Sequence, residues 1–343
     1  MNKQKNKRIC ILIVLLSILL FISGCAKADD NKEAIEENTE EETEENESYI
    51  PEAFVFTHDP YKISDEYLSV YGEGLEDVFY ALVDSLIKGE NSFSCPSEER
   101  MWQAIYAARC YCPVAYVFLK QDRCYFKNGT AHLSYTISGE ELSEKYREFV
   151  AKVEDVMHHA IQYQEEDYIM AMELLSYLAE KNTVDEDSSL DTIMEISPYR
   201  AIMEDIGICQ EFSGEYIYYL TQLGINAFPV SSLTADLSDA HEWVMMEIDG
   251  KYYHSDPMYS LSYPGSLYFF CMDDIQREYY GDFPLKYFNY LGTDVADRDK
   301  YLCTDRRFEY LWLAKEFEID HSARRIRLRN INTDAYLEYP LNN

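Results

Sequence analysis

Three residue types that together perform thiol chemistry occur in fixed order within residues 209–256. Cys209 lies in a Gly-Ile-Cys-Gln stretch, His241 is followed by Glu-Trp, and Asp256 is followed by proline. A thiol nucleophile needs a base to take its proton, and the base needs a third group to orient it. The sequence therefore predicts nucleophilic catalysis with Cys209 as the nucleophile, His241 as the base and Asp256 as the orienting group.

The residues after Cys209 predict the element that positions its thiol. Apolar side chains recur at helical spacing up to residue 223, and Gly224 is typical of the position just after a helix. Cys209 then lies in the first turn, where free N–H groups and the helix dipole favour a thiolate. The alternative is an ordinary packed cysteine, and position alone does not decide between the two.

A hairpin signal between the histidine and the aspartate predicts that these side chains meet. If Asp249-Gly250 is a two-residue turn, facing positions on the two strands have numbers that sum to 499. His241 and Asp256 then lie on one face as diagonal neighbours, with Cα atoms roughly 7–8 Å apart. A three-residue turn would place them on opposite faces. His254 shares that face and is the competing base, although a mid-strand histidine more often belongs to the core.

Other periodic segments predict a protein of mixed helices and strands. Helices are expected over 77–87, 97–108 and 142–160, and a further amphipathic helix over 171–178. Residues 114–137 alternate apolar and polar side chains around Asn128-Gly129, which predicts a hairpin. No repeat of 20 to 50 residues is visible, which excludes solenoids and propellers.

Together the three motifs resemble those of the transglutaminase-like superfamily, papain-fold thiol enzymes that include transglutaminases and related bacterial peptidases. The matching stretches are residues 207–213, 241–243 and 248–258, and a looser similarity extends back to about residue 140. The resemblance implies an α+β core in which a helix bearing the cysteine packs on an antiparallel sheet bearing the histidine and aspartate. Departures from the family pattern are expected to alter the cleft wall and the substrate class; they are Glu211, Glu242 and Met258.

The chemistry expected of these residues is acyl transfer through a thioester on protein or peptide amides. The Cys209 backbone N–H is one expected donor to the oxyanion, and no second donor is assigned; Gln210 is predicted to point elsewhere. With water as acceptor the enzyme is a peptidase or amidase, and with an amine it cross-links. The alternatives are a catalytically inactive domain that binds peptide or cell-wall ligands, and a structural surface lipoprotein.

The amino terminus predicts export and lipid anchoring. Basic residues precede an apolar run over 9–22, which is too short to span a bilayer and is typical of a secretory signal. The run ends in Ile-Ser-Gly before Cys25, which resembles the lipobox of bacterial lipoproteins. We therefore expect a signal peptide over 1–24, lipidation of Cys25 and a location on the extracellular face of a bacterial membrane. The alternative is an ordinary cleaved signal peptide.

Charge and composition divide the rest of the chain. Residues 25–50 are strongly acidic and are predicted to form a disordered linker. Of the formal net charge of −33, about −28 remains on residues 51–343 once the signal and linker are removed, which excludes nucleic acid as a partner. The predicted regions are an N-terminal α+β region over 51–138, a catalytic domain over 139–285 and a C-terminal extension packed on it over 286–343.

Seven cysteines remain after the signal peptide and Cys25 are set aside. We expect buried thiols, or one or two disulfides, besides Cys209. Zinc is not favoured, because the spacing of the first four cysteines after the linker lacks paired Cys-x-x-Cys hairpins. No nucleotide-binding glycine loop, zinc-protease helix or calcium loop is present, so no cofactor and no metal are predicted. The expected partners are a protein or peptide substrate and, through the lipid, a membrane.

Overall fold

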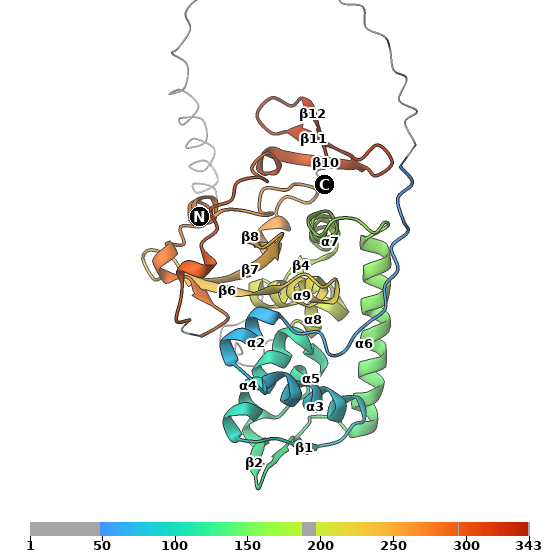
Figure 1. Cartoon of the computed structure of the whole chain (residues 1–343), viewed down its shortest axis with the longest axis vertical. Coiled ribbons are helices and arrows are strands. Elements are labelled where there is room, and N and C mark those ends of the chain that lie inside the picture. Colours follow the sequence, from blue (N-terminus) through green and yellow to red (C-terminus); the bar gives the residue numbers. More distant parts are fainter. Residues whose placement is uncertain (1–48, 187–196, 294, 342–343) are drawn as a thin grey trace, which may run out of the picture. The chain divides into compact units, whose positions relative to one another are not determined.

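The computed structural model describes residues 49–186, 197–293 and 295–341 (Figure 1). The predicted signal peptide over 1–24, the lipidation site Cys25 and nearly all of the linker over 25–50 lie outside the described residues. The described part combines helices with antiparallel sheets, so the predicted α+β class is confirmed. Within it, no helix is long and apolar enough to cross a bilayer.

A four-stranded antiparallel sheet carries the histidine and leads to the aspartate. Its strand order is β8-β7-β6-β9, and its strands are β6 (Ala227–Leu233), β7 (Ala240–Ile248), β8 (Lys251–Ser255) and β9 (Asn289–Tyr290). Ile248 faces Lys251 and Val244 faces Ser255, which confirms the predicted two-residue turn and its register. Asp249 and Gly250 both have positive φ, as such a turn requires.

The helix that begins at the cysteine packs on this sheet. It is α9 (Cys209–Gln222), its neighbours are β6 and β7, and Gly224 follows it with a φ of +87° (Figure 1). The approach of α8 to α9 is very close, because a Cβ on Gly214 would lie 2.3 Å from Cγ of Pro198. A cysteine-bearing helix packed on an antiparallel sheet is the core arrangement that the motifs implied.

The N-terminal region is helical with a small sheet. Its helices are α2 (Asp65–Tyr71), α3 (Leu75–Ile87), α4 (Glu98–Tyr111) and α5 (Pro113–Val117), with the short helix η2 (Gln121–Arg123). Its sheet has the order β1-β3-β2, formed by β1 (Ser92–Ser94), β2 (Tyr125–Lys127) and β3 (Thr130–His132). The helices predicted over 77–87 and 97–108 are therefore confirmed.

The hairpin predicted over 114–137 is wrong at its amino-terminal end. Strand pairing is limited to residues 125–132 around Asn128 and Gly129, and residues 113–117 form α5 instead. Pro113 occupies the first turn of that helix, where a proline costs no hydrogen bond, and the next three side chains are all buried. An uninterrupted apolar run fits a short buried helix as well as a strand.

The middle of the chain contributes three helices and a short strand pair, of which α7, α8 and β5 contact α9. It contains α6 (Gly139–Ala160), α7 (Asp167–Lys181) and α8 (Tyr199–Glu204), and a two-stranded parallel pair, β4 (Thr183–Val184) with β5 (Ile206–Gly207). The helices predicted over 142–160 and 171–178 are confirmed. Helix α6 starts with a capping box, in which Ser138 and Glu141 satisfy each other's backbone N–H groups.

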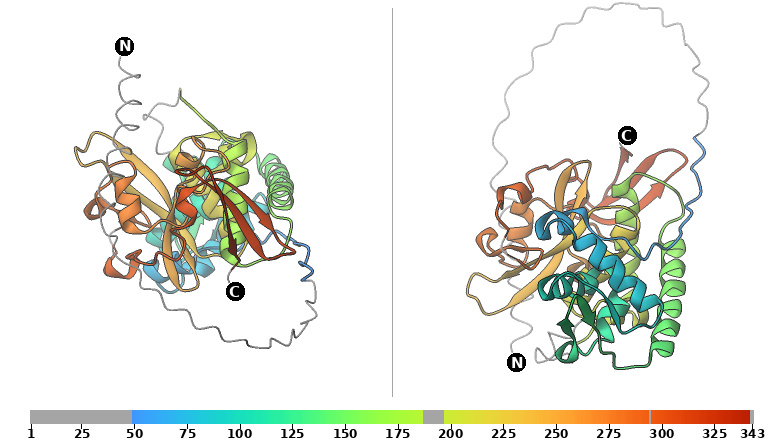
Figure 2. Two further views of the ribbon diagram at one scale, coloured as in Figure 1. Left: turned by 90° about the horizontal axis from the view of Figure 1, so that it is seen from above. Right: turned by 60° about the horizontal axis from the view of Figure 1, so that its bottom comes forward.

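The rest of the chain after β8 adds short helices and a second sheet. It contains α10 (Pro257–Ser260), α11 (Asp274–Tyr279), the short helices η4 (Leu285–Tyr287), η5 (Asp299–Tyr301) and η6 (Leu311–Leu313), and an antiparallel sheet of β10 (Ala314–Asp320), β11 (Arg325–Asn330) and β12 (Tyr336–Pro340). Figure 2 shows the C-terminal strands, in red, next to the green helical part of the chain. His321, which follows β10, forms ion pairs with Glu173 on α7 and with Glu165 just before that helix.

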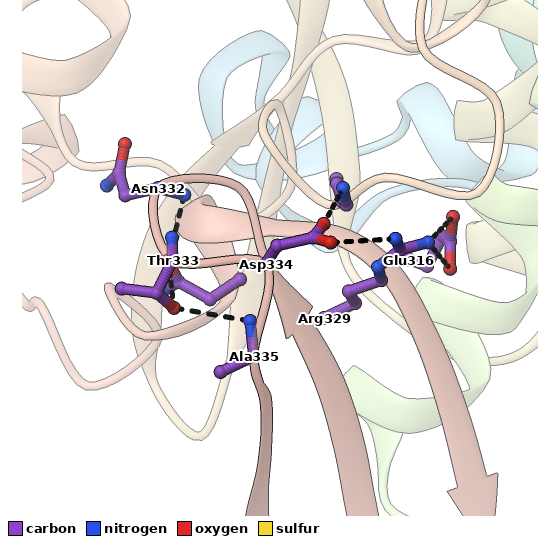
Figure 3. A network of polar contacts seen from close by, with 8 residues as sticks. Glu316, Arg329, Asn332, Thr333, Asp334 and Ala335 are labelled. Atoms are coloured by element: carbon purple, nitrogen blue, oxygen red, sulfur yellow. Dashed lines mark hydrogen bonds and ion pairs between the residues drawn. The ribbon is translucent and has the colours of Figure 1, made fainter.

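Exposed charges also organise the C-terminal sheet. Arg329 on β11 lies 3.1 Å from Glu316 on β10 and 3.1 Å from Asp334 in the following turn, which also binds Lys315 (Figure 3). The neighbouring Asn330 side chain accepts backbone hydrogen bonds from Asn332 and Thr333 and shapes the same turn. These contacts fix the β11–β12 connection far from the residues that could do chemistry.

One hydrophobic cluster runs through all three regions. It includes Phe56 near the start of the described part, Phe228 in the central sheet and Leu341 at its end. A buried carboxylate, Glu66 on α2, adds a polar connection, since it accepts hydrogen bonds from Tyr252 on β8 and Tyr301 near the C terminus. The N-terminal helices, the sheet and the C-terminal segment therefore share a single core.

Candidate functional site

The three predicted residues come together at one end of the sheet. His241 Nε2 lies 2.7 Å from Asp256 Oδ2, and the Cys209 thiol lies close enough to the same imidazole to raise its pKa. Nε2 is engaged by the carboxylate, so Nδ1 is the nitrogen left for the thiol. Asp256 is fully buried, His241 is 6% exposed and Cys209 is half-buried. The arrangement is a nucleophile, a base and an orienting carboxylate in the expected order.

The environment of His241 favours the imidazolium form. Burial alone would lower its pKa, but the Asp256 charge, the hydrogen bond to Asp256 and the hydrogen bond with Cys209 outweigh it and raise the pKa to about 9. Arg277 acts in the opposite direction. A positively charged imidazole beside a thiol is the environment in which a thiolate forms at neutral pH.

Asp256 is held in place by the backbone as well as by the histidine. It is the N-cap of α10, and its Oδ1 accepts a hydrogen bond from the Tyr259 N–H at 3.0 Å. Burial would raise the pKa of Asp256, but the charges of His241 and Arg277 and the hydrogen bonds keep it below the ordinary value. Asp256 therefore stays ionised and fixes the proton on Nε2 of the imidazole.

Aromatic rings enclose the imidazole. Tyr259 stacks on it with ring centroids 4.7 Å apart and planes at 17°, and Phe283 lies at 5.5 Å and 22°. Trp243 on the same strand lies at 6.0 Å and 26°. This packing removes water from the His241–Asp256 hydrogen bond and limits rotation of the ring.

The competing base is excluded by its surroundings. His254 is fully buried, its Nδ1 accepts a hydrogen bond from Trp243 Nε1 at 2.9 Å, and its Nε2 lies 3.0 Å from Asp274. Burial lowers the pKa of His254 against the effect of Asp274, so the ring is neutral. His254 is therefore a core residue that fixes Trp243.

Glu211, one of the departures from the family pattern, supports the start of α9. Its Oε2 accepts a hydrogen bond from the Ile208 N–H at 3.0 Å, and both of its carboxylate oxygens bind the Arg200 guanidinium. Gly207 leaves room for it, since a Cβ there would lie 3.0 Å from the Glu211 side chain. The side chain is buried and does not line the cleft, so the expectation that it alters the cleft wall is wrong.

The other departures have separate roles. Glu242 follows the histidine, is almost buried, and forms an ion pair with Arg109 of α4 at 2.9 Å. It lines the cleft, as expected, but with its charge matched by a cation. Met258 is not among the residues that line the cleft.

A cavity of about 410 Å³ opens beside the thiol. Among its lining residues Glu242 is the only carboxylate, and none is a lysine or an arginine. The lining comes from α9, the β6–β7 hairpin and the β9 segment, and consists of Ile208, Cys209, Gln210, Ser231, Ser232, Leu233, Ala240, His241, Glu242, Tyr287 and Asn289.

Sequence reasoning missed two residues near the triad. Gln210 lines the cleft instead of pointing elsewhere, and its Oε1 is buried without a hydrogen-bond partner in the described part of the chain. Arg277 of α11 is fully buried beside Asp256. Helical spacing could have flagged neither, because Gln210 lies at the irregular first turn and Arg277 is distant in sequence.

The described cysteines are unpaired, and one of them lies in a group of residue types that can bind metals. All seven cysteines in the described residues are free thiols, and all but Cys209 are buried. In the same residues, the set whose ligand atoms lie within 4.8 Å of one another is His254, Asp274 and Cys303. Each of them already has a hydrogen-bond partner, and burial raises the pKa of Cys303 and lowers that of His254. The set fits an internal hydrogen-bond cluster better than a cation site.

Comparisons with known proteins give distant structural similarities. No family model and no curated protein matches the chain. A structure described as a "Putative Cysteine Protease from Cytophaga hutchinsonii" is 14% identical over 43% of this chain and 41% of its own, with a TM-score of 0.27. A TGase structure is 16% identical over 39% and 42%, with a TM-score of 0.27. The periplasmic domain of TgpA from Pseudomonas aeruginosa, bound to ethylmercury, is 15% identical over 34% and 45%, with a TM-score of 0.25.

The chain spans less than half the length of each of these three structures. The catalytic interpretation therefore depends on the side chains around Cys209 and not on these similarities.

Proposed function

We propose that the protein is a thiol enzyme that performs acyl transfer on protein or peptide amides through Cys209, His241 and Asp256. The observation that carries the proposal is the grouping of the Cys209 thiol, the His241 imidazole and the buried Asp256 carboxylate at the wall of an open cavity. A binding domain has no need of a half-buried thiol against an imidazole whose pKa is raised to about 9.

The proposed reaction begins with a proton already on the imidazole. The Cys209 thiolate attacks the amide carbonyl carbon, and the oxyanion that forms is met by the Cys209 backbone N–H, which has no intrahelical acceptor at the start of α9. The C–N bond breaks as His241 gives its proton to the departing amine, leaving a thioester. His241 then takes a proton from the acceptor, which attacks the thioester and releases Cys209.

The acceptor and the location are parts of the same proposal. Water as acceptor makes the protein a peptidase or amidase, and a primary amine makes it a cross-linking enzyme. The proposed export signal and the lipid on Cys25 would hold the enzyme on the extracellular face of the membrane, where surface proteins and wall peptides are the available substrates. The acidic linker over 25–50 is proposed as the spacer between lipid and enzyme.

The second candidate function is a binding domain for peptide or cell-wall ligands that uses the same cavity without catalysis. The observation that favours it is the character of the lining, which is largely neutral and offers hydrogen-bonding groups from Ser231, Ser232 and Asn289. Such groups would hold an extended chain whether or not the thiol reacts.

Alkylation of Cys209 by iodoacetamide, followed by mass spectrometry from pH 4 to 9, decides between the two. We expect rapid labelling well below pH 8 in the wild type, because the imidazolium stabilises the thiolate. His241→Ala should shift the midpoint of labelling toward about 8.5, the ordinary range of a thiol. The matched control is His159→Ala, which removes an exposed histidine from α6.

The binding function is favoured instead if wild-type labelling rises only near the ordinary thiol range and His241→Ala changes nothing. If the labelling supports catalysis, a labelled primary amine shows whether water or an amine is the acceptor. Its incorporation into protein indicates cross-linking, and release of a free carboxylate alone indicates hydrolysis.

A further inference from the structure

We infer that Arg277 is a positioning residue of the catalytic site: by compensating the charge of Asp256, it makes the Cys209 thiolate the counter-ion of the imidazolium. This inference rests on the proposed thiol chemistry at Cys209. It assigns a role to a fully buried arginine that no motif of the chain includes.

Arg277 contacts the same carboxylate oxygen as the catalytic base. A terminal guanidinium nitrogen lies 3.1 Å from Asp256 Oδ2, and His241 Nε2 lies 2.7 Å from that oxygen. A second guanidinium nitrogen donates to the Tyr280 carbonyl at 2.7 Å. One carboxylate is thus shared between a guanidinium and an imidazole, and both the carboxylate and the guanidinium are fully buried.

The arginine is fixed by the aromatic rings that enclose the histidine. Its guanidinium lies 4.0 Å from the centroid of the Trp243 ring and 5.1 Å from that of Phe283. Trp243 is in turn held by His254, whose other nitrogen binds Asp274 on the helix that carries Arg277. This closed set of contacts holds the guanidinium at the carboxylate and explains why the fully buried cation keeps its position.

Counting buried charges shows what the arginine does. Without it, Asp256 and a protonated His241 already form a neutral pair, and the thiol keeps its proton. With it, Asp256 and Arg277 form the neutral pair, so a protonated His241 requires a second anion. The Cys209 thiolate is the group placed to supply that anion, and the arginine therefore promotes the reactive form of the cysteine.

Other charged and titratable groups lie around Asp256, His241 and Arg277, and several of them are already paired. Glu242 on β7 is paired with Arg109 on α4, and Glu211 on α9 is paired with Arg200 on α8. Other titratable groups near the site are Tyr259 on α10, Asp239 before β7, the His254–Asp274 pair, and Asp273 before α11, which is paired with Arg306. Arg277 is the cation in contact with the carboxylate of the triad.

The test is the pH midpoint of iodoacetamide labelling at Cys209 in the full chain. Arg277→Met should move the midpoint upward by about one pH unit, because a cation near a site typically shifts a titration by one or more units. Arg277→Lys keeps the positive charge, so its labelling midpoint should stay close to that of the wild type. Arg325→Met, which removes a mostly exposed arginine from β11, is the control for net charge and should match the wild type.

Two outcomes of this series overturn the inference. One is an unchanged midpoint in a folded Arg277→Met protein, and the other is an equal shift in the methionine and lysine variants, which would assign the effect to packing. A wild-type midpoint already near about 8.5 would instead remove the proposed function, whatever Arg277 does.

A second pair of variants decides the case if circular dichroism shows that Arg277→Met does not fold. Asp256→Asn leaves the guanidinium without its counter-charge, whereas Asp256→Asn/Arg277→Gln removes both buried charges together. We expect the midpoint of the double variant to lie about one pH unit above that of Asp256→Asn. Equal midpoints in the two proteins would contradict an electrostatic role for Arg277.

Discussion

At the scale of single residues, the imidazole of His241 links the proposed catalysis to stability. Its pKa in the folded protein is about 9, above the 6.5 expected of an unfolded chain. The imidazolium therefore stabilises the fold fully below about pH 6.5, and this contribution is lost as the pH rises through about 9. The same titration removes the proton that the departing amine needs, so acylation should also decline above about pH 9.

We expect the free energy of unfolding of the wild type to fall, relative to that of His241→Gln, between about pH 6.5 and 9. The difference should be on the order of 3 kcal/mol across this range. Urea unfolding at pH 6, 7.5 and 9 measures it, and His159→Gln on the exposed face of α6 should behave as the wild type. If the free energies of unfolding of the wild type and His241→Gln change with pH in the same way, the histidine is not charged in the folded protein.

How far the site could be read from the sequence differs from residue to residue. Cys209, His241 and Asp256 were predictable because the Asp249-Gly250 turn fixes the register of two neighbouring strands. Arg277 was not, because its partner Asp256 lies 21 positions earlier and no local pattern connects them. The role of Glu211 was misjudged for the same reason, since its partner Arg200 precedes it on another helix.

At the scale of elements, α9 carries a second unusual carboxyl group. Glu215 is buried inside the helix packing, and its oxygen accepts a hydrogen bond from Asn182 at 2.6 Å. Burial raises its pKa to about 8, against the opposing effect of Asn182. The protonated Glu215 side chain contributes its full stability to the fold below about pH 4.5, the pKa of a glutamate in the unfolded chain. This contribution is lost as the pH rises toward 8.

Glu215→Gln should therefore make α9 and the whole fold more stable at pH 8 and nearly as stable at pH 5. The expected gain at pH 8 is on the order of a few kcal/mol, because the neutral amide never has to be ionised in the core. Thermal unfolding at the two pH values measures it. Glu180→Gln, at the exposed end of α7, is the control and should show no such difference. A gain that is equal at both pH values would assign the effect to packing.

The elements themselves were predictable where their periodicity was long. Helix α6 has apolar side chains at alternating steps of four and three from Leu142 to Ala160, and it starts with a capping box at Ser138 and Glu141. The segment 113–117 was not predictable from its pattern, because five residues are too few to separate a helix from a strand. Packing against the N-terminal core determined its structure.

At the scale of the molecule, the predicted regions share one core. The hydrophobic cluster includes Phe56, Phe228 and Leu341, and Glu66 joins the first helix to β8 and to the C-terminal segment. The boundaries at residues 138 and 285 remain predictions about evolutionary or functional regions. Physically, neither boundary separates two sets of buried side chains.

We expect residues 51–343 to unfold in a single transition whose midpoint does not change with reductant. The shared core makes the regions depend on one another, and the seven described cysteines are free thiols. Calorimetry of the whole chain with and without dithiothreitol measures both properties. Two separate transitions, or a midpoint lowered by the reductant, would contradict the shared core or the free thiols respectively.

The stacking of Tyr259 and Phe283 on His241 has a consequence for the order of the proposed reaction. A ring that cannot turn, with Nε2 bound to Asp256, exchanges protons through a single edge. The departing amine and the incoming acceptor must then use the same place in succession. The first product leaves before the second reactant enters, and water competes with every amine for the same position beside the His241 ring. We therefore expect the proposed enzyme to show ping-pong kinetics, in which the ratio of cross-linked to hydrolysed product rises with the amine concentration.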